Sequence, residues 1–317
     1  MKVEINTLYR EIRDRLTSLY GAAEASAIAF ALLEDKYGMT RTDVLCGKDK
    51  EFSAEEAQDY AEILEKLAAG LPLQYATGRA LFCDRYFKVT PATLIPRPET
   101  EKAPFLLPPI GGEHEASGRG IQALPLSGGD GGGLLLDCGT GTGCIAITIA
   151  LEHPDWQVEA WDISEEALAV AQENAEALGA PNVTFLQKDI LAEAQQCGCQ
   201  MQEADLSIPP ARGDRGVDYI VSNPPYICDR EAADMEAHVL DHEPHTALFV
   251  PDDDPLLFYR ALAEIARVRL VPGGWLVVEC NRAYTEETAA LFRDYGLVDI
   301  EIIDDCFGAP RFVRARK

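Results

Sequence analysis

The stretch that decides the fold reads Tyr219-Ile220-Val221-Ser222-Asn223-Pro224-Pro225-Tyr226. Its apolar first part predicts a buried strand, and the prolines end that strand because they cannot donate to a sheet ladder. Proline also excludes the helical conformation from the residue before it, so the loop is stiff. In open α/β sheets, ligands bind at the carboxyl ends of strands, where this loop would lie.

This loop suits a planar group that carries an NH2. Asn223 offers one carbonyl and one amide, the prolines present carbonyls without a competing N–H, and Tyr226 offers a flat ring. The alternative is a tight turn that happens to contain two prolines, since such residues are common in turns.

A glycine-rich loop upstream complements this stretch. Leu134-Leu135-Leu136-Asp137 predicts a short buried strand, followed by Cys138-Gly139-Thr140-Gly141-Thr142-Gly143 and a helix over 144–151. Glycines let the backbone pass close to a ligand, and the helix start offers free N–H groups. A dinucleotide fingerprint needs G-x-G-x-x-G, but Cys144 occupies the sixth position, so a dehydrogenase is disfavoured.

Acidic residues follow the next two predicted strands. Asp162 ends the strand 158–162, where it could accept hydrogen bonds from ribose hydroxyls, although capping of the helix from Ser164 is an alternative role. Asp189 follows the strand 183–186, in reach of an adenine amino group. Strands and helices alternate as far as residue 295. The last two strands, 298–303 and 312–314, have no helix between them and predict an antiparallel hairpin at a sheet edge.

The flanking regions predict a second domain and two insertions. Residues 1–75 predict a small helical bundle, and residues 76–103 predict a β-hairpin linker to a main domain over 104–317. Segments 104–133 and 194–216 predict loose insertions, because their composition buries too little apolar surface to offset the ordering entropy. We interpret Cys197-Gly198-Cys199 as a loop with two incidental thiols.

Charge and cysteine content limit the class of function. The net charge of −25 disfavours sequence-independent binding to a nucleic-acid backbone. The first fifteen residues fit neither a signal peptide nor a transit peptide, and no apolar run approaches the length of a membrane span. Nine scattered cysteines without C-x-x-C pairs suit the reduced thiols of a cytoplasmic protein.

These motifs together resemble a known family. The glycine-rich loop, Asp162 and Asn223-Pro224-Pro225-Tyr226 resemble class I S-adenosylmethionine-dependent methyltransferases. With Leu94-Ile95-Pro96-Arg97-Pro98-Glu99-Thr100-Glu101 and the helical amino-terminal region, the chain resembles more specifically the HemK/PrmC family, the peptide-chain release factor glutamine methyltransferases.

The resemblance implies a fold and a reaction. The fold would be α/β, a seven-stranded doubly wound Rossmann-like sheet with an antiparallel terminal hairpin, plus the small amino-terminal helical bundle. The reaction would transfer a methyl group from S-adenosylmethionine, leaving S-adenosylhomocysteine. The acceptor would be the side-chain amide nitrogen of the glutamine in the Gly-Gly-Gln motif of peptide-chain release factors.

The resemblance also implies site residues. Those that would bind the cofactor are Gly139, Thr140, Gly141, Thr142, Gly143, Asp162, Asp189, Ile190 and Asn223. Those that would bind the substrate are Asn223, Pro224, Pro225, Tyr226 and Arg97, with Asn223, Pro224 and Tyr226 as the catalytic set. The chain departs from the family pattern at Ile190, where an aromatic residue is usual, and at Cys280-Asn281, where Gly and Gln are common.

Other functions stay open. The spacing of His238, His242, Glu243 and His245 could form a metal site, but the segment 243–248 resembles the family's Glu-Pro-x-x-Ala-Leu, so no metal is expected. A ribosomal-protein glutamine is an alternative acceptor. A nucleic-acid amino group is another, because enzymes acting on an exocyclic NH2 use similar loops. A non-catalytic cofactor-binding protein is the third hypothesis.

Overall fold

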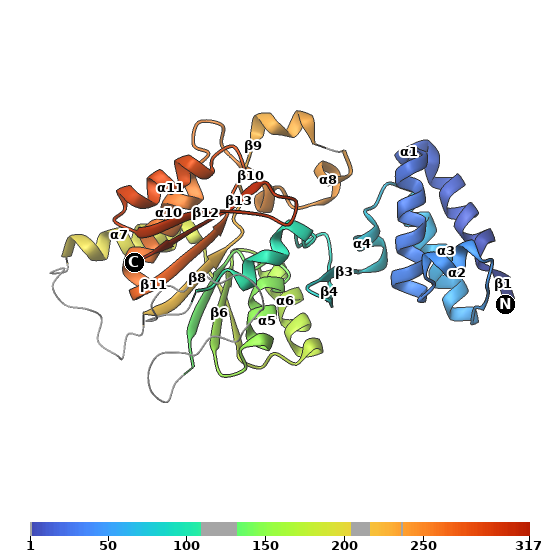
Figure 1. Cartoon of the computed structure of the whole chain (residues 1–317), viewed down its shortest axis with the longest axis horizontal. Coiled ribbons are helices and arrows are strands. Elements are labelled where there is room, and N and C mark those ends of the chain that lie inside the picture. The colour runs from blue at the N-terminus through green and yellow to red at the C-terminus, as the bar shows by residue number, and fades with distance from the viewer. Residues whose placement is uncertain (1, 109–131, 204–215, 236) are drawn as a thin grey trace. The chain divides into compact units, whose positions relative to one another are not determined.

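The computed structural model describes residues 2–108, 132–203, 216–235 and 237–317 (Figure 1). The chain divides into two compact units, one of residues 1–79 with 236–242 and the other of 80–235 with 243–317. Residues 80–103, expected to form a linker, pack within the second unit.

The first unit is helical with one small β-ladder. Its helices are α1 (Ile5–Tyr37), α2 (Arg41–Leu45), α3 (Ala54–Ala68), α4 (Leu73–Thr77) and α8 (Ala237–His242). Strand β1 (Lys2–Glu4) pairs antiparallel with β2 (Asp49–Glu51). The predicted capping box is present: Ser53 and Glu56 exchange side-chain and backbone hydrogen bonds at the start of α3. Buried residues such as Ile12, Leu16 and Leu64 form the core.

Helix α1 corrects one expectation from the sequence. By length and composition it could cross a membrane, so the prediction that no apolar run approaches that length is wrong. Inside it, however, Gly21 has φ 78° and ψ 163°, which are not helical values, so α1 is two helices joined at a kink. Neither half reaches the roughly 20 residues that a span requires. Ile12 and Leu33, from the two halves, lie in the core of the first unit, so each half packs residues into that core.

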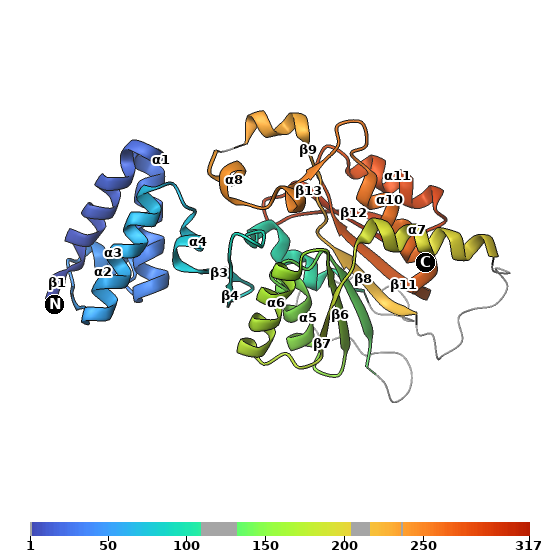
Figure 2. The same cartoon turned by 180° about the vertical axis from the view of Figure 1, so that it is seen from behind.

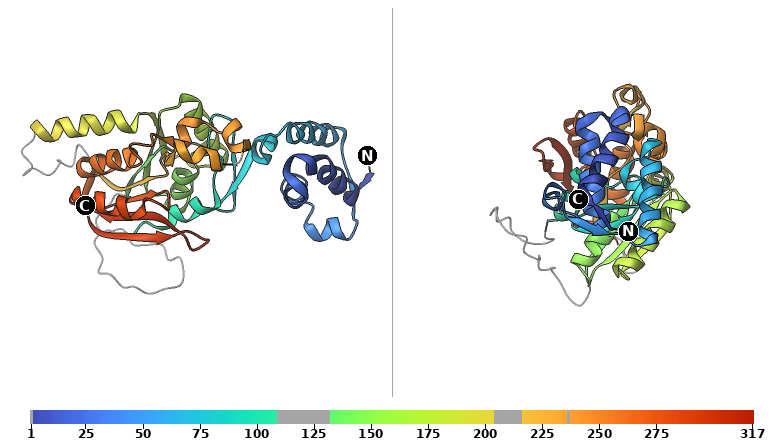
Figure 3. Two further views of the ribbon diagram at one scale, coloured as in Figure 1. Left: turned by 90° about the horizontal axis from the view of Figure 1, so that it is seen from above. Right: turned by 90° about the vertical axis from the view of Figure 1, so that its right-hand side faces the viewer.

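The second unit is built on a seven-stranded sheet with the order β12-β13-β11-β8-β5-β6-β7. The strands are β5 (Leu134–Cys138), β6 (Gln157–Asp162), β7 (Val183–Gln187), β8 (Val217–Ser222), β11 (Leu270–Glu279), β12 (Val298–Asp304) and β13 (Pro310–Arg316). Strand β13 runs antiparallel to both neighbours, and the other neighbouring pairs are parallel. The predicted terminal hairpin is therefore confirmed, and it is drawn in red in Figure 3. The strand order places β12 at the edge of the sheet.

Helices cover both faces of this sheet, because its central strands are apolar on both sides. Leu135 and Tyr219 share a core cluster with α5 (Cys144–Glu152), and α6 (Glu165–Leu178) lies next to α5 (Figure 2). The next residues along the same strands, Leu136 and Ile220, share the other cluster with α10 (Leu257–Arg269) and α11 (Thr285–Asp294). This alternation confirms the doubly wound arrangement.

A β-hairpin packs beside α5. Its strands are β3 (Arg79–Phe82) and β4 (Arg85–Lys88), joined by Cys83 and Asp84, which both have positive φ. Two central residues with positive φ match the twist of a type I′ hairpin. Phe82 and Phe87 lie in the α5 cluster, so the hairpin shares the core of the second unit.

The expected loose segments are partly ordered. Residues 194–203 lie in helix α7 (Ile190–Glu203), which packs on α10. Ile190, Ala194 and Cys197 are buried at helical spacing, and Cys197 is a core residue rather than a loop thiol. In the other segment, Leu106 and Leu107 are buried just after the 3₁₀ helix η1 (Pro98–Phe105). Residues 109–131 and 204–215 lie outside the described residues.

We predict that Gly143→Ala destabilises the protein more than Gly179→Ala. Both glycines have positive φ, so each substitution costs about 1 kcal/mol of backbone strain. At Gly143, however, a Cβ would also meet Ile147 Cδ1 at 2.7 Å and Ala171 Cβ at 3.2 Å, whereas nothing lies within 4 Å at Gly179. Urea unfolding followed by tryptophan fluorescence measures the difference, expected to be at least about 1 kcal/mol. Equal losses would contradict the steric argument.

Candidate active site

The two loops singled out by the sequence leave neighbouring strands together. Strands β5 and β8 pair in parallel, with Cys138 opposite Ser222. The Ser222 hydroxyl donates to the Cys138 carbonyl at 2.6 Å. The glycine-rich loop and the Asn-Pro-Pro-Tyr loop therefore begin side by side at the carboxyl edge of the sheet.

The glycine-rich loop is fixed by hydrogen bonds to β6. The N–H groups of Gly139 and Thr140 both donate to the Trp161 carbonyl, at 2.9 and 2.8 Å. The Thr140 hydroxyl donates to Asp137 Oδ2 at 2.7 Å. Asp137 is fully buried, and this burial raises its pKa to about 7. The Trp161 carbonyl and the buried Asp137 carboxylate thus hold the loop in place.

Asn174 on α6, which the sequence analysis did not single out, supports the same loop. Its Nδ2 donates to the carbonyls of Thr142 (2.9 Å) and Lys88 (3.0 Å), and its Oδ1 accepts from the Lys88 N–H (2.7 Å). One buried amide therefore joins the glycine-rich loop, α6 and the β3–β4 hairpin.

Asp162 and Asp189 both receive backbone hydrogen bonds. Asp162 accepts from the N–H of Gly141 at 2.8 Å and of Ser164 at 3.0 Å, and burial raises its pKa. The side-chain cap of α6 is Ser164, whose hydroxyl accepts from the Ala167 N–H. Asp189 accepts from the Leu191 N–H at 2.8 Å, at the start of α7.

A cavity of about 380 Å³ lies at these strand ends. The predicted site residues that line it are Arg97, Gly139, Thr140, Gly141, Thr142, Asp162, Asp189, Ile190, Asn223 and Pro225. The predicted residues Gly143, Pro224 and Tyr226 are not part of its lining. Lining residues that the sequence analysis did not assign to the site include Thr93, Leu94, Thr100, Ile163 and Phe258. Leu94 and Thr100 belong to a quoted motif and Ile163 follows Asp162, whereas Phe258 lies in the helix Leu257–Arg269 and carried no signal.

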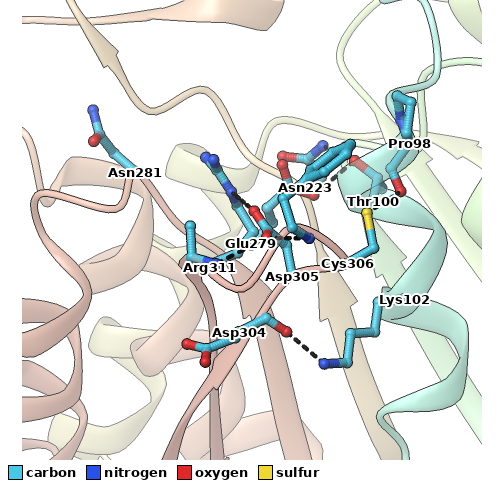
Figure 4. Close-up of polar contacts among 12 residues, drawn as sticks. Pro98, Thr100, Lys102, Asn223, Glu279, Asn281, Asp304, Asp305, Cys306 and Arg311 are labelled. Atoms are coloured by element: carbon cyan, nitrogen blue, oxygen red, sulfur yellow. Dashed lines mark hydrogen bonds and ion pairs between the residues drawn. The ribbon is translucent and has the colours of Figure 1, made fainter.

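A chain of hydrogen bonds connects Asn223 to a buried carboxylate (Figure 4). Asn223 Nδ2 donates to Thr100 Oγ1 at 3.3 Å, and the Thr100 hydroxyl donates to Glu279 Oε2 at 2.7 Å. The Tyr226 hydroxyl donates to the other oxygen, Glu279 Oε1, at 3.1 Å. Both loop residues are thus attached to Glu279 at the end of β11.

Glu279 is only 2% exposed. Burial raises its pKa to about 7, opposed by the Thr100 hydrogen bond and by the positive charge of Arg311. Arg311 on β13 in turn contacts Asp305 at 3.3 Å. The sequence analysis assigned Glu279 no role in the site, because nothing local indicates what its carboxylate contacts.

Asn281, where the chain departs from the family pattern, makes specific hydrogen bonds near the Asn-Pro-Pro-Tyr loop. Asn281 Nδ2 donates to the Tyr226 carbonyl at 3.3 Å and to the Glu231 carboxylate at 3.0 Å. Glu231 belongs to the 3₁₀ helix η2 (Asp229–Asp234). Asn281 therefore holds the backbone that follows the two prolines.

A second segment supports the other side of the same loop. The Tyr226 N–H donates to the Leu248 carbonyl at 3.2 Å, at the end of α9 (His245–Leu248). Strand β9 (Ile227–Cys228) then pairs in parallel with β10 (Phe249–Val250). The Asn-Pro-Pro-Tyr loop is thus held from both sides.

Arg97, expected to contact a substrate, forms an ion pair with Glu243 at 2.7 Å. The Glu243 side chain is only 1% exposed, while Arg97 is 31% exposed and also lines the cavity. The Glu243 carboxylate is thus paired with the Arg97 guanidinium. Among the residues that the structure describes, no group of three or more His, Cys, Asp or Glu is placed to hold a metal ion.

Comparison with known proteins agrees with this arrangement. Residues 130–294 match a family described as a methyltransferase domain, and residues 7–78 match the PrmC N-terminal domain. The release factor glutamine methyltransferase of Bacteroides thetaiotaomicron is 39% identical over 99% of this chain and 100% of its own length. The chain belongs to the release factor glutamine methyltransferase family. The Bacillus subtilis member is 37% identical over 92% of this chain and 91% of its own length.

Membership in the release factor glutamine methyltransferase family confirms the resemblance seen in the motifs. The two matched regions coincide with the two expected parts of the chain, the amino-terminal helices and the α/β sheet. A solved methyltransferase structure from Pyrococcus furiosus is 19% identical, with a TM-score of 0.39 over 59% of this chain and 76% of its own, a likeness that adds nothing to the family evidence.

We predict that Glu279→Gln becomes more stable relative to the wild type as pH rises. The Glu279 pKa rises from an ordinary 4.5 to about 7 on folding, so between these values the folded state binds more protons. The wild-type free energy of unfolding therefore loses roughly 3 kcal/mol between about pH 4.5 and 7. Glutamine lacks this titration. Urea unfolding across this range tests it, with the exposed Glu176→Gln on α6 as control. Parallel pH curves for Glu279→Gln and wild type would refute the assignment.

We also predict that Arg97→Met is destabilising by about 3 kcal/mol, because it leaves the buried Glu243 as an unpaired charge. The double variant Arg97→Met/Glu243→Gln should recover most of this loss, since it removes the charge as well. Chemical denaturation of both variants gives the comparison. A double variant as unstable as Arg97→Met would mean that packing of the arginine stem, not the ion pair, is what matters.

Proposed function

We propose that this protein transfers a methyl group from S-adenosylmethionine to the side-chain amide nitrogen of the glutamine in the Gly-Gly-Gln motif of peptide-chain release factors. The observation that carries the proposal is the position of Asn223, which lines a cavity shared with the glycine-rich loop. The near full-length similarity to relatives that bear the release factor name supports the same substrate.

The cavity fits the proposed methyl donor. Its volume of about 380 Å³ falls within the range of small-molecule sites, ~300–1,000 Å³. Gly139 and Gly141 have positive φ and let the backbone approach a ligand closely. The acidic side chains of Asp162 and Asp189 and the apolar side chains of Ile163 and Ile190 also line it.

These groups give each part of the methyl donor a place. Asp162 would hold the ribose, the glycine-rich loop the methionine part, and Asp189 with Ile190 the adenine. When bound, S-adenosylmethionine supplies a methyl group attached to a positively charged sulfur.

The Asn-Pro-Pro-Tyr loop would orient the acceptor. An amide nitrogen is a poor nucleophile because its lone pair is delocalised, so orientation must contribute much of the rate. The Asn223 side-chain oxygen and the Pro224 carbonyl would each accept one N–H of the glutamine amide. The same two oxygens would stabilise the positive charge that develops on the nitrogen. Tyr226 would pack against the amide plane.

The proposal implies a protein substrate and a cytoplasmic location. All nine cysteines are free thiols, as expected in a reducing compartment. The net charge of −25 would repel a phosphate backbone, so a protein acceptor is favoured over a nucleic acid.

Labelled methyl transfer tests the proposal. The protein is incubated with methyl-labelled S-adenosylmethionine and, separately, a release factor, its Gln→Ala loop variant, and DNA. Label on the release factor that disappears with the glutamine supports the assignment. Label on nucleic acid alone, or none despite measurable cofactor binding, would overturn it.

We predict that Asn223→Ala lowers this transfer by about a hundredfold, because the glutamine amide loses an oriented acceptor. The exposed Gln172→Ala on α6 is the matched control, since it removes a side-chain amide remote from the cavity. Radiolabel incorporation into the release factor gives both rates. Full activity in Asn223→Ala would remove Asn223 from the catalytic set.

A further inference from the structure

We infer that Thr100 and Glu279 are positioning residues that fix the side-chain amide of Asn223, with its oxygen facing the cavity and its nitrogen facing Thr100. This inference rests on the proposed function, because it states which atom of Asn223 would receive the glutamine amide. It adds two residues that the motif-based site did not contain.

The direction of the hydrogen bonds follows from counting protons. The Thr100 hydroxyl has one hydrogen, and its oxygen, Oγ1, lies 2.7 Å from Glu279 Oε2. Above its pKa of about 7, Glu279 is an ionised carboxylate that can only accept, so Thr100 must donate to it. Thr100 Oγ1 is then left with lone pairs toward Asn223. Only the NH2 end of the Asn223 amide can make the 3.3 Å contact with it.

The reverse orientation is disfavoured by burial. If the Asn223 oxygen faced Thr100, the hydroxyl would have to turn its hydrogen away from Glu279. Thr100 and Glu279 are 3% and 2% exposed, so water could not replace the lost donor to the carboxylate. Leaving one oxygen of a buried carboxylate without a donor costs more than losing a hydrogen bond between neutral groups.

Glu279 is itself held in one orientation. Its second oxygen accepts from the Tyr226 hydroxyl at 3.1 Å, while Arg311 on β13 supplies a nearby positive charge. Three separate segments, η1, the loop after β8 and the end of β11, therefore meet at one carboxylate (Figure 4). None of these contacts depends on a bound ligand.

The consequence is selectivity for a hydrogen-bond donor. With Oδ1 toward the cavity, Asn223 presents an acceptor, which suits the NH2 of a glutamine side chain. A glutamate carboxylate in the same place would set two acceptors against each other and would be rejected. The distinction between amide and acid would thus originate at Glu279.

Substitution of Thr100 tests the chain of hydrogen bonds that runs from Glu279 through Thr100 to Asn223, which we call the relay. Thr100→Val keeps the shape and removes the hydroxyl. We expect kcat for release-factor methylation to fall about ten- to a hundredfold, because the Asn223 amide is free to turn. The KM for the release factor and the affinity for S-adenosylmethionine should stay within about twofold, since neither contact uses the hydroxyl. Thr100→Ser, which restores the hydroxyl, should restore kcat.

Glu279→Gln tests the other half of the relay. Its side chain has nearly the same shape but can donate through its NH2, so the chain of hydrogen bonds can run in either direction. We expect a fall in kcat without loss of cofactor binding. A wild-type kcat in this variant would show that the carboxylate does not set the direction.

Three other kinetic results would also contradict the inference. They are an unchanged kcat in Thr100→Val, an equal fall in Thr100→Val and Thr100→Ser, and a loss of cofactor binding in Thr100→Val. If the wild-type protein labels no release factor, the proposed function fails instead. The direction of the Thr100 hydrogen bond is then decided without turnover by neutron diffraction at a pH above the Glu279 pKa of about 7. A Thr100 deuteron directed at Glu279 supports it, and one directed at Asn223 overturns it.

Discussion

The parallel pairing of β5 with β8 is the constraint on which the candidate site depends. It places Cys138 opposite Ser222, residues 84 positions apart in the chain, and joins them by the 2.6 Å hydrogen bond from the Ser222 hydroxyl. A slip of one residue would exchange Leu135 and Leu136 between the two core clusters, so the apolar core fixes this register. The geometry of the polar site is thus a consequence of hydrophobic packing beneath it.

The site is organised at a cost in stability. Asp137 and Glu279 are both buried carboxyls whose pKa values burial raises to about 7, so ionising them opposes folding. Each holds a threonine hydroxyl: Thr140 in the glycine-rich loop and Thr100 beside Asn223. A protein that places fixed acceptors where a reaction occurs need not reorganise them during catalysis. The destabilising charges are therefore located where orientation matters most.

The sequence predicted the features that depend on local pattern. Strand periodicity and the two loops predicted the sheet, its terminal hairpin and the part of the cavity lining that the two loops supply, because apolar alternation and Gly and Pro act over a few residues. It failed where contacts are distant: Arg97 and Glu243 are 146 residues apart, and Thr100 and Glu279 are 179 apart. Helix α7 was not predicted because most of its residues are polar or small, although Ile190, Ala194 and Cys197 recur at helical spacing.

The two roles weighed for Asp162 are compatible. Its oxygens accept from the Gly141 and Ser164 N–H groups at 2.8 and 3.0 Å, and the side-chain cap of α6 comes from Ser164 instead. A carboxylate has about four lone-pair positions, so these hydrogen bonds leave Asp162 the capacity to accept a further one, as the proposed ribose contact requires. The backbone hydrogen bonds fix the direction of those remaining positions. A structural contact of this kind therefore prepares a binding group, and finding one is not evidence against a functional role.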